Sequence, residues 1–99
     1  MTINKNQEGS ALVVELQGRL DTNTAPELEQ VLNESLGGIT ELEIDFSELD
    51  YISSAGLRVL LTTHKTMVGK DGSMKVTGAN EVVREIFDVT GFADILTIE

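Results

Sequence analysis

Two adjacent serines, Ser53 and Ser54, are the residues of this sequence whose hydroxyl groups and position best suit a reversible modification. They follow a strand-like run that ends at Phe46 and a short connection, and they stand where the next helix is predicted to begin. The small residues Ala55 and Gly56 come next, so we expect the first turn of that helix to be open to an approaching protein. Unpaired backbone amides and the positive end of the helix dipole tolerate an added phosphate at such a place. The pattern therefore allows a serine that is phosphorylated.

The same pattern has a simpler interpretation, in which a serine only caps the helix. Serine is among the favoured N-cap residues, and spacing and composition alone favour the cap. The two interpretations are compatible if Ser53 caps the helix and Ser54 is displayed.

We expect no catalytic residue, metal site or cofactor. His64, the only histidine, lies on the apolar side of the helix that begins at the serine pair. It is about 15 Å along the axis from the second serine, which is too far for proton transfer. The acidic pairs Glu43/Asp45 and Glu27/Glu29 lack a nearby histidine and the spacing of a calcium loop, so solvated surfaces are favoured. There are no cysteines, which excludes disulfides, thiolate zinc sites and cysteine nucleophiles.

The charge balance limits the class of partner. Seven basic and 17 acidic residues give a net charge of −10, which disfavours nucleic acid and anionic membranes as partners. An acidic surface suits a protein partner with a basic face, although from charge alone a role in solubility is the better explanation. The sequence lacks an apolar run of roughly 20 residues and the layout of a signal peptide. We expect a soluble cytoplasmic protein that is a monomer or a weak dimer.

Hydrophobic periodicity predicts the elements that position these residues. Alternating apolar residues predict strands at 12–17, 42–46 and 73–77, and shorter strands at 2–5 and 95–98. Helical spacing predicts helices over 25–36, 54–68 and 81–90. Strand–helix alternation indicates a single α/β domain over residues 1–99, with a mixed sheet of about four to five strands and three to four helices packed on it.

The helix boundaries and buried faces are specified further. Thr24 to Glu27 form a predicted capping box, in which the Thr24 hydroxyl accepts the Glu27 amide, and Asn80 is the predicted cap of the third helix. The predicted buried face of the second helix consists of Leu57, Leu60, Leu61, His64 and Val68, and that of the third helix consists of Val82, Val83, Ile86 and Phe87.

Three separate segments resemble one known family. The run from Asp45 to Leu57, which contains Ser53-Ser54-Ala55-Gly56, is similar to the signature of the STAS-domain anti-sigma-factor antagonists. The segment 18–21 (Gly-Arg-Leu-Asp) resembles the family's Gly-x-Leu-Asp turn, and 83–92 resembles its third helix and following turn. The resemblance covers essentially the whole chain.

The resemblance implies a protein-binding switch. Ser54 matches the serine that a partner kinase phosphorylates, and Asp21 matches an acidic residue near it. The family often has aspartate just before the phosphoserine, whereas this sequence has Ser53 at that position. Because Ser53 also carries a hydroxyl, it is a rival phosphate acceptor. The implied partners are an ATP-dependent anti-sigma-factor serine kinase, whose capture frees a sigma factor, and a phosphatase. The implied partner-binding residues are Asp21, Thr22, Asn23, Ser53, Ser54, Ala55, Gly56 and Arg58.

Two other functions stay open. The chain could be a non-switching STAS subunit of a lipid-transport complex or a signalling scaffold, in which the serine-containing helix start is only an interface. A small enzyme or ligand-binding domain is supported by the fold class alone.

Overall fold

The computed structural model describes all 99 residues. It confirms the predicted α/β class, with helices that alternate with strands after an N-terminal hairpin. The strands are β1 (Thr2–Glu8), β2 (Ala11–Leu20), β3 (Glu41–Ile52), β4 (Ser73–Thr77) and β5 (Thr97–Ile98), and the helices are α1 (Ala25–Ser35), α2 (Ser54–Gly69) and α3 (Glu81–Thr90). A short 3-10 helix, Phe92–Asp94, follows α3. No helix is long and apolar enough to cross a lipid bilayer.

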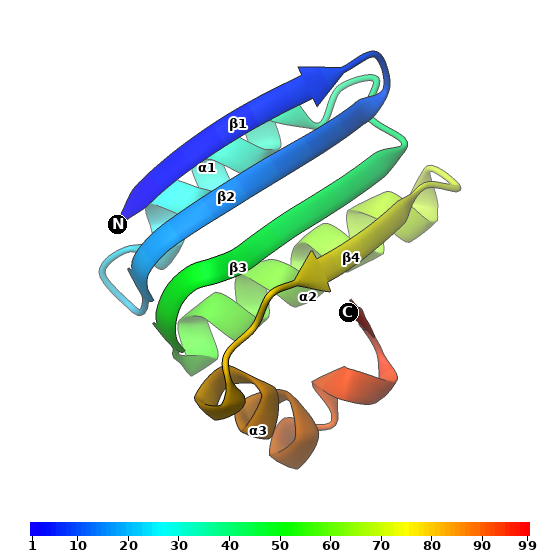
Figure 1. Cartoon of the computed structure of the whole chain (residues 1–99). Helices are drawn as coiled ribbons and strands as arrows, with labels where there is room; N and C mark the ends of the chain where they lie inside the picture. The colour runs from blue at the N-terminus through cyan, green and yellow to red at the C-terminus, as the bar shows by residue number, and fades with distance from the viewer.

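The five strands form one mixed sheet in which spatial order equals chain order, β1-β2-β3-β4-β5. The β1–β2 pair is antiparallel, whereas β2, β3, β4 and β5 run parallel to one another. Because successive parallel strands are joined by helices, their carboxyl ends meet at one edge of the sheet. Figure 1 shows that α2 begins at this edge, directly after β3.

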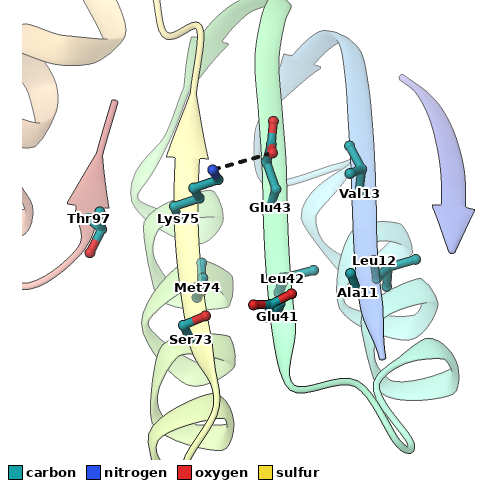
Figure 2. A pocket seen from close by; sticks show the side chains of 10 residues that line it. All are labelled: Ala11, Leu12, Val13, Glu41, Leu42, Glu43, Ser73, Met74, Lys75 and Thr97. Atoms are coloured by element: carbon teal, nitrogen blue, oxygen red, sulfur yellow. Dashed lines mark ion pairs between the residues drawn. The ribbon is translucent and has the colours of Figure 1, made fainter. Parts of the chain in front are cut away.

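One face of the sheet forms the core and is covered by α1 and α2 (Figure 1). Alternate strand residues are buried there, as the period of two requires: Leu12, Val14, Leu16, Leu42, Ile44, Phe46, Met74 and Val76. The other face is bare and carries polar side chains, although parallel sheets are usually covered on both faces. Figure 2 shows this bare face, where Lys75 lies 3.8 Å from Glu43.

Helix α3 is fixed at the carboxyl edge of the sheet by apolar and polar contacts. The ring of Phe87 stacks on that of Phe46 at 6.1 Å between centroids. The predicted cap is confirmed, because the Asn80 side-chain oxygen accepts from the Val83 N–H at 2.8 Å. The Asn80 amide also donates to the carbonyl oxygen of Leu49 at 3.2 Å. Helix α3 therefore begins against the last part of β3.

Strand β3 continues to Ile52, so the prediction that this strand ends at Phe46 was wrong. The register of β3 against β2 shifts twice, between Glu15 and Gln17 and between Gly18 and Arg19. Each bulge places an extra residue in β3 and changes which side chains face the core. The buried residues of β3 after Ile44 are Phe46, Leu49 and Ile52, whose spacing departs from strict alternation.

Smaller corrections concern exposed valines and the last strand. Val68 and Val82 were predicted to be buried, but they lie on the surface. Val68 is the next-to-last residue of α2 and Val82 is the second residue of α3, and their neighbours Met67 and Val83 take the buried positions instead. The predicted strand over 95–98 is confined to Thr97–Ile98, because the N–H groups of Ile95 and Leu96 bond back to the Phe92 carbonyl oxygen at the end of the 3-10 helix.

Candidate functional site

The two predicted site segments meet at the carboxyl edge of the sheet. Leu20 and Ile52 are register partners at the ends of β2 and β3. One residue further on, the Ser53 N–H donates to the Leu20 carbonyl oxygen at 2.9 Å. The turn that begins at Asp21 and the start of α2 are therefore neighbours, although about 30 residues separate them in the chain.

Ser53 occupies the N-cap position without using its side chain as a cap. Its backbone is extended, and its carbonyl oxygen accepts the first bond of the helix from the Leu57 N–H at 3.0 Å. Its hydroxyl oxygen is buried and has no hydrogen-bond partner. Ser53 therefore holds the predicted N-cap position of α2, but its hydroxyl makes no capping hydrogen bond.

Ser54 is the first residue of α2 and is exposed. Arg58 follows one helical turn later and is also exposed, so the two side chains share a face of the helix. Ala55 is half-buried beside them. The structure thus presents one hydroxyl of the serine pair to solvent and covers the other.

Gly56 is buried, so the expectation that it leaves the first turn open to a partner is corrected. A Cβ atom at this position would lie 2.7 Å from the Leu20 Cγ atom and 2.8 Å from the Ile52 Cγ1 atom. The missing side chain lets the first turn of α2 pack directly on β2 and β3. Gly56 therefore supports the site from beneath and does not line its surface.

Asp21 organises the turn between β2 and α1. One carboxylate oxygen accepts from the N–H groups of Asn23 at 3.0 Å and Thr24 at 3.1 Å. The Thr24 hydroxyl accepts from the Asp21 N–H at 2.8 Å and donates to the Arg19 carbonyl oxygen at 2.7 Å. The predicted capping box is absent, because this hydroxyl points back along β2 and the Glu27 N–H bonds to the Thr24 carbonyl oxygen instead. The turn leaves Thr22 and Asn23 exposed.

These hydrogen bonds also set the charge state of Asp21. Desolvation acts to raise the pKa of its carboxyl group, but bonds from the Thr24 and Asn23 N–H groups and the Thr24 hydroxyl, together with the Arg19 charge, outweigh it. The pKa of Asp21 is therefore lowered from its ordinary value of 3.8. The site contains a fixed negative charge in the turn that follows Leu20, the residue whose carbonyl oxygen accepts the Ser53 N–H.

Sequence reasoning missed Arg19 and Tyr51, which lie near the carboxyl ends of β2 and β3. The Arg19 guanidinium carbon lies 4.6 Å from the Tyr51 ring centroid, and its Nε atom lies 3.8 Å from the Asp21 carboxylate. Arg19 and Tyr51 are register partners in the β2–β3 pair. Their pairing depends on the bulges in β3, which no local pattern revealed.

A protein-family model described as STAS domain matches residues 2–99. The chain belongs to the STAS-domain family of anti-sigma-factor antagonists. The anti-sigma-B factor antagonist of Staphylococcus epidermidis is 30% identical over 86 residues, which cover 86% of this chain and 80% of that protein. An anti-sigma factor antagonist structure from Mycobacterium paratuberculosis has a TM-score of 0.88 at 26% identity, over 98% of this chain and 83% of that one.

The anti-sigma factor antagonist SpoIIAA shares the fold of this STAS domain. Its unphosphorylated form has a TM-score of 0.79 at 15% identity, over 99% of this chain and 87% of that one. The phosphorylated form of SpoIIAA, a Bacillus cell fate determinant, has a TM-score of 0.78 at 16% identity, over 99% of this chain and 91% of that one. The curated relatives are named as anti-sigma-factor antagonists, and the SpoIIAA structures share the fold of this STAS domain.

Other polar groups of the STAS domain lie on α2 and on the bare face of the sheet. No cluster of three or more His, Cys, Asp or Glu side chains could hold a metal ion. His64 is half-buried on α2, as predicted. A hollow of about 330 Å³ lies on the bare face of the sheet, where Glu41, Glu43 and Lys75 are among its lining residues (Figure 2). This hollow lies on a different surface of the domain from the serine pair.

Proposed function

We propose that this STAS domain is a phosphorylation-controlled antagonist of an anti-sigma factor. The unphosphorylated form binds an anti-sigma factor that is also a serine kinase, and this binding frees a sigma factor for transcription. The kinase transfers phosphate from ATP to Ser54, the modified domain dissociates, and a phosphatase restores it. The observation that carries the proposal is the contrast within the serine pair, since Ser54 is exposed and the Ser53 hydroxyl oxygen is buried.

The position of Ser54 suits a phosphate without refolding. As the first residue of α2 it lies at unpaired backbone N–H groups and at the positive end of the helix dipole. Both stabilise an anion there. The phosphorylated domain is therefore expected to keep its fold, which a reversible switch requires.

The same phosphate opposes partner binding. It adds a charge of about −1.5 to −2 at neutral pH, beside the ionised Asp21 and in a chain whose net charge is already −10. A partner surface shaped for a neutral hydroxyl would have to cover this charge, and burial of an uncompensated charge costs several kcal/mol. A loss of about 3 kcal/mol already lowers affinity more than a hundredfold. The existence of SpoIIAA in unphosphorylated and phosphorylated forms agrees with this kind of control in the family.

Phosphotransfer in vitro tests the proposal. The purified chain is incubated with ATP and the anti-sigma-factor kinase of its own organism, and the intact mass is measured. We expect one phosphate, retained in Ser53→Ala and lost in Ser54→Ala. An increment that maps to Ser53 would contradict the assignment. Stable binding with no phosphotransfer would instead favour a non-switching STAS subunit of a transport complex or scaffold.

A further inference from the structure

Helix α3 carries an apolar stripe that the core uses only through its middle residue, Ile86. Val82 and Val89 are 54% and 77% exposed, and Ile86 between them is only partly buried. Their spacing of four and three residues places them on one side of the helix, about 100° from the side that buries Val83 and Phe87. The helix therefore has one apolar side packed in the core and a second apolar stripe that is exposed except where Ile86 packs against the core.

A row of acidic residues runs beside this stripe. Glu81, Glu85 and Asp88 precede the three apolar residues by one position each, so they lie about 100° further round the helix. All three are exposed. The surface of α3 thus combines an apolar line and a parallel line of negative charge.

The beginning of the stripe is tied to the serine site. Asn80, two residues before Val82, donates its side-chain amide to the carbonyl oxygens of Leu49 and Asp50 in the last part of β3. Three residues after Asp50 the chain reaches Ser53. Figure 1 shows α3 below the carboxyl end of β3, on the side where α2 begins. A protein large enough to cover Ser54 can therefore reach α3 as well.

We infer that the stripe Val82–Ile86–Val89 and its acidic border form a second part of the docking surface for the anti-sigma factor. The inference rests on the proposed function. The part of the partner that sits on α3 is an amphipathic element with apolar side chains flanked by Lys or Arg, because that chemistry complements both lines at once. A second copy of this chain is a poor occupant, since it would oppose acidic rows on two molecules that each have a net charge of −10.

This surface is tested by calorimetric titration, which measures the affinity of the purified anti-sigma-factor kinase for the whole chain. The double variant Val82→Ser/Val89→Ser is expected to weaken binding at least tenfold, because two side chains lose apolar burial at the interface. Val68→Ser is the matched control, since Val68 is 58% exposed but lies at the opposite end of α2. Circular dichroism should show unchanged folding for all three proteins. Equal affinities of the double variant and the control would overturn the inference.

Neutralisation of the acidic row gives an independent result. Glu81→Gln/Glu85→Gln/Asp88→Asn should slow association several-fold in low salt, and the difference from the unmodified chain should vanish near 1 M salt. Glu29→Gln/Glu34→Gln/Glu41→Gln removes the same charge elsewhere and should have a smaller effect. Equal effects of the two triple variants would overturn the role of the row.

Two further outcomes separate the possible failures. If Ser54→Ala abolishes phosphotransfer while the α3 variants bind normally, the serine switch stands and the α3 surface is wrong. If Val82→Ser/Val89→Ser instead converts a dimer of this chain to a monomer in sedimentation, the stripe binds a second copy and the inference is also wrong.

Discussion

The backbone N–H of Ser53 donates to the carbonyl oxygen of Leu20 at 2.9 Å, which extends the contact between β2 and β3 one residue past Ile52. This bond holds the start of α2 next to Asp21, whose carboxylate organises the neighbouring turn. A phosphate on Ser54 would thereby be held at a defined position relative to the Asp21 carboxylate. The following predictions test this arrangement.

Negative charge at position 54 should weaken partner binding without loss of folding. We expect Ser54→Asp to lower affinity about tenfold or more, equivalent to about 1.4 kcal/mol, because the partner would have to cover a charge beside Asp21. Ser54→Asn is the matched neutral control of similar size and should remain within about threefold of the unmodified chain. Titration of the kinase measures both. Similar affinities for the aspartate and asparagine variants would contradict the electrostatic mechanism.

A side chain at position 56 should destabilise the domain. In Gly56→Ala the new Cβ atom would lie 2.7 Å from the Leu20 Cγ atom and 2.8 Å from the Ile52 Cγ1 atom, and both side chains are fully buried. Overpacking of this kind costs about 1–3 kcal/mol. Gly69→Ala, at the other end of the same helix, meets nothing within 4 Å and should leave stability unchanged or slightly raised. Urea denaturation distinguishes them, and equal midpoints would refute the close packing at Gly56.

Removal of the Ser53 hydroxyl should not lower stability. The hydroxyl oxygen is buried without a hydrogen-bond partner, so Ser53→Ala removes an unsatisfied polar group and should leave the free energy of unfolding unchanged or raise it by about 1–3 kcal/mol. Asn80→Ala is the comparison, because Asn80 does cap its helix through the Val83 N–H and should cost about 1 kcal/mol. A loss in Ser53→Ala as large as that in Asn80→Ala would show that Ser53 acts as a side-chain cap after all.

The carboxylate of Asp21 should stabilise the protein above its ordinary pKa of 3.8. Because folding lowers this pKa, the unfolded chain binds more protons in the window between the two values, so stability rises with pH there. The contribution is present at neutral pH and is lost as pH falls through the folded pKa. Asp21→Asn should therefore be less stable than the unmodified chain at pH 7, and the gap should narrow as pH falls below 3.8. A constant gap across this range would exclude the charge as the cause.

The order of strands and helices could be predicted because it depends on local periodicity. Leu42, Ile44 and Phe46 alternate with polar residues, and the cap at Asn80 is a local bond, so both features can be recognised within a few residues. The later half of β3 could not be predicted in this way. Its two bulges move Leu49 and Ile52 onto the core face at a spacing that resembles a loop.

The candidate site was predicted in outline but not in its contacts. The motif at Ser53 and Ser54 identified the segment, but the direction of each hydroxyl depends on how α2 lies against β2 and β3. The role of Gly56 depends on Leu20, which is distant in sequence. The Thr24 hydroxyl bonds to Arg19 because the turn after β2 folds back on itself, which a capping pattern does not reveal. Site geometry therefore required the tertiary structure.

The strands lie in the sheet in the same order as in the chain, and this has a consequence for synthesis on the ribosome. Strand β2 pairs with β1, β3 with β2, β4 with β3 and β5 with β4. Each strand thus emerges when the edge that it joins has already been made, and no strand has to insert between two others that are already paired. Each parallel strand is joined to its neighbour in the sheet by one helical crossover, so strand contacts link neighbouring segments of the chain, and contacts close in sequence favour fast folding. The nascent sheet can therefore grow in one direction at the pace of translation.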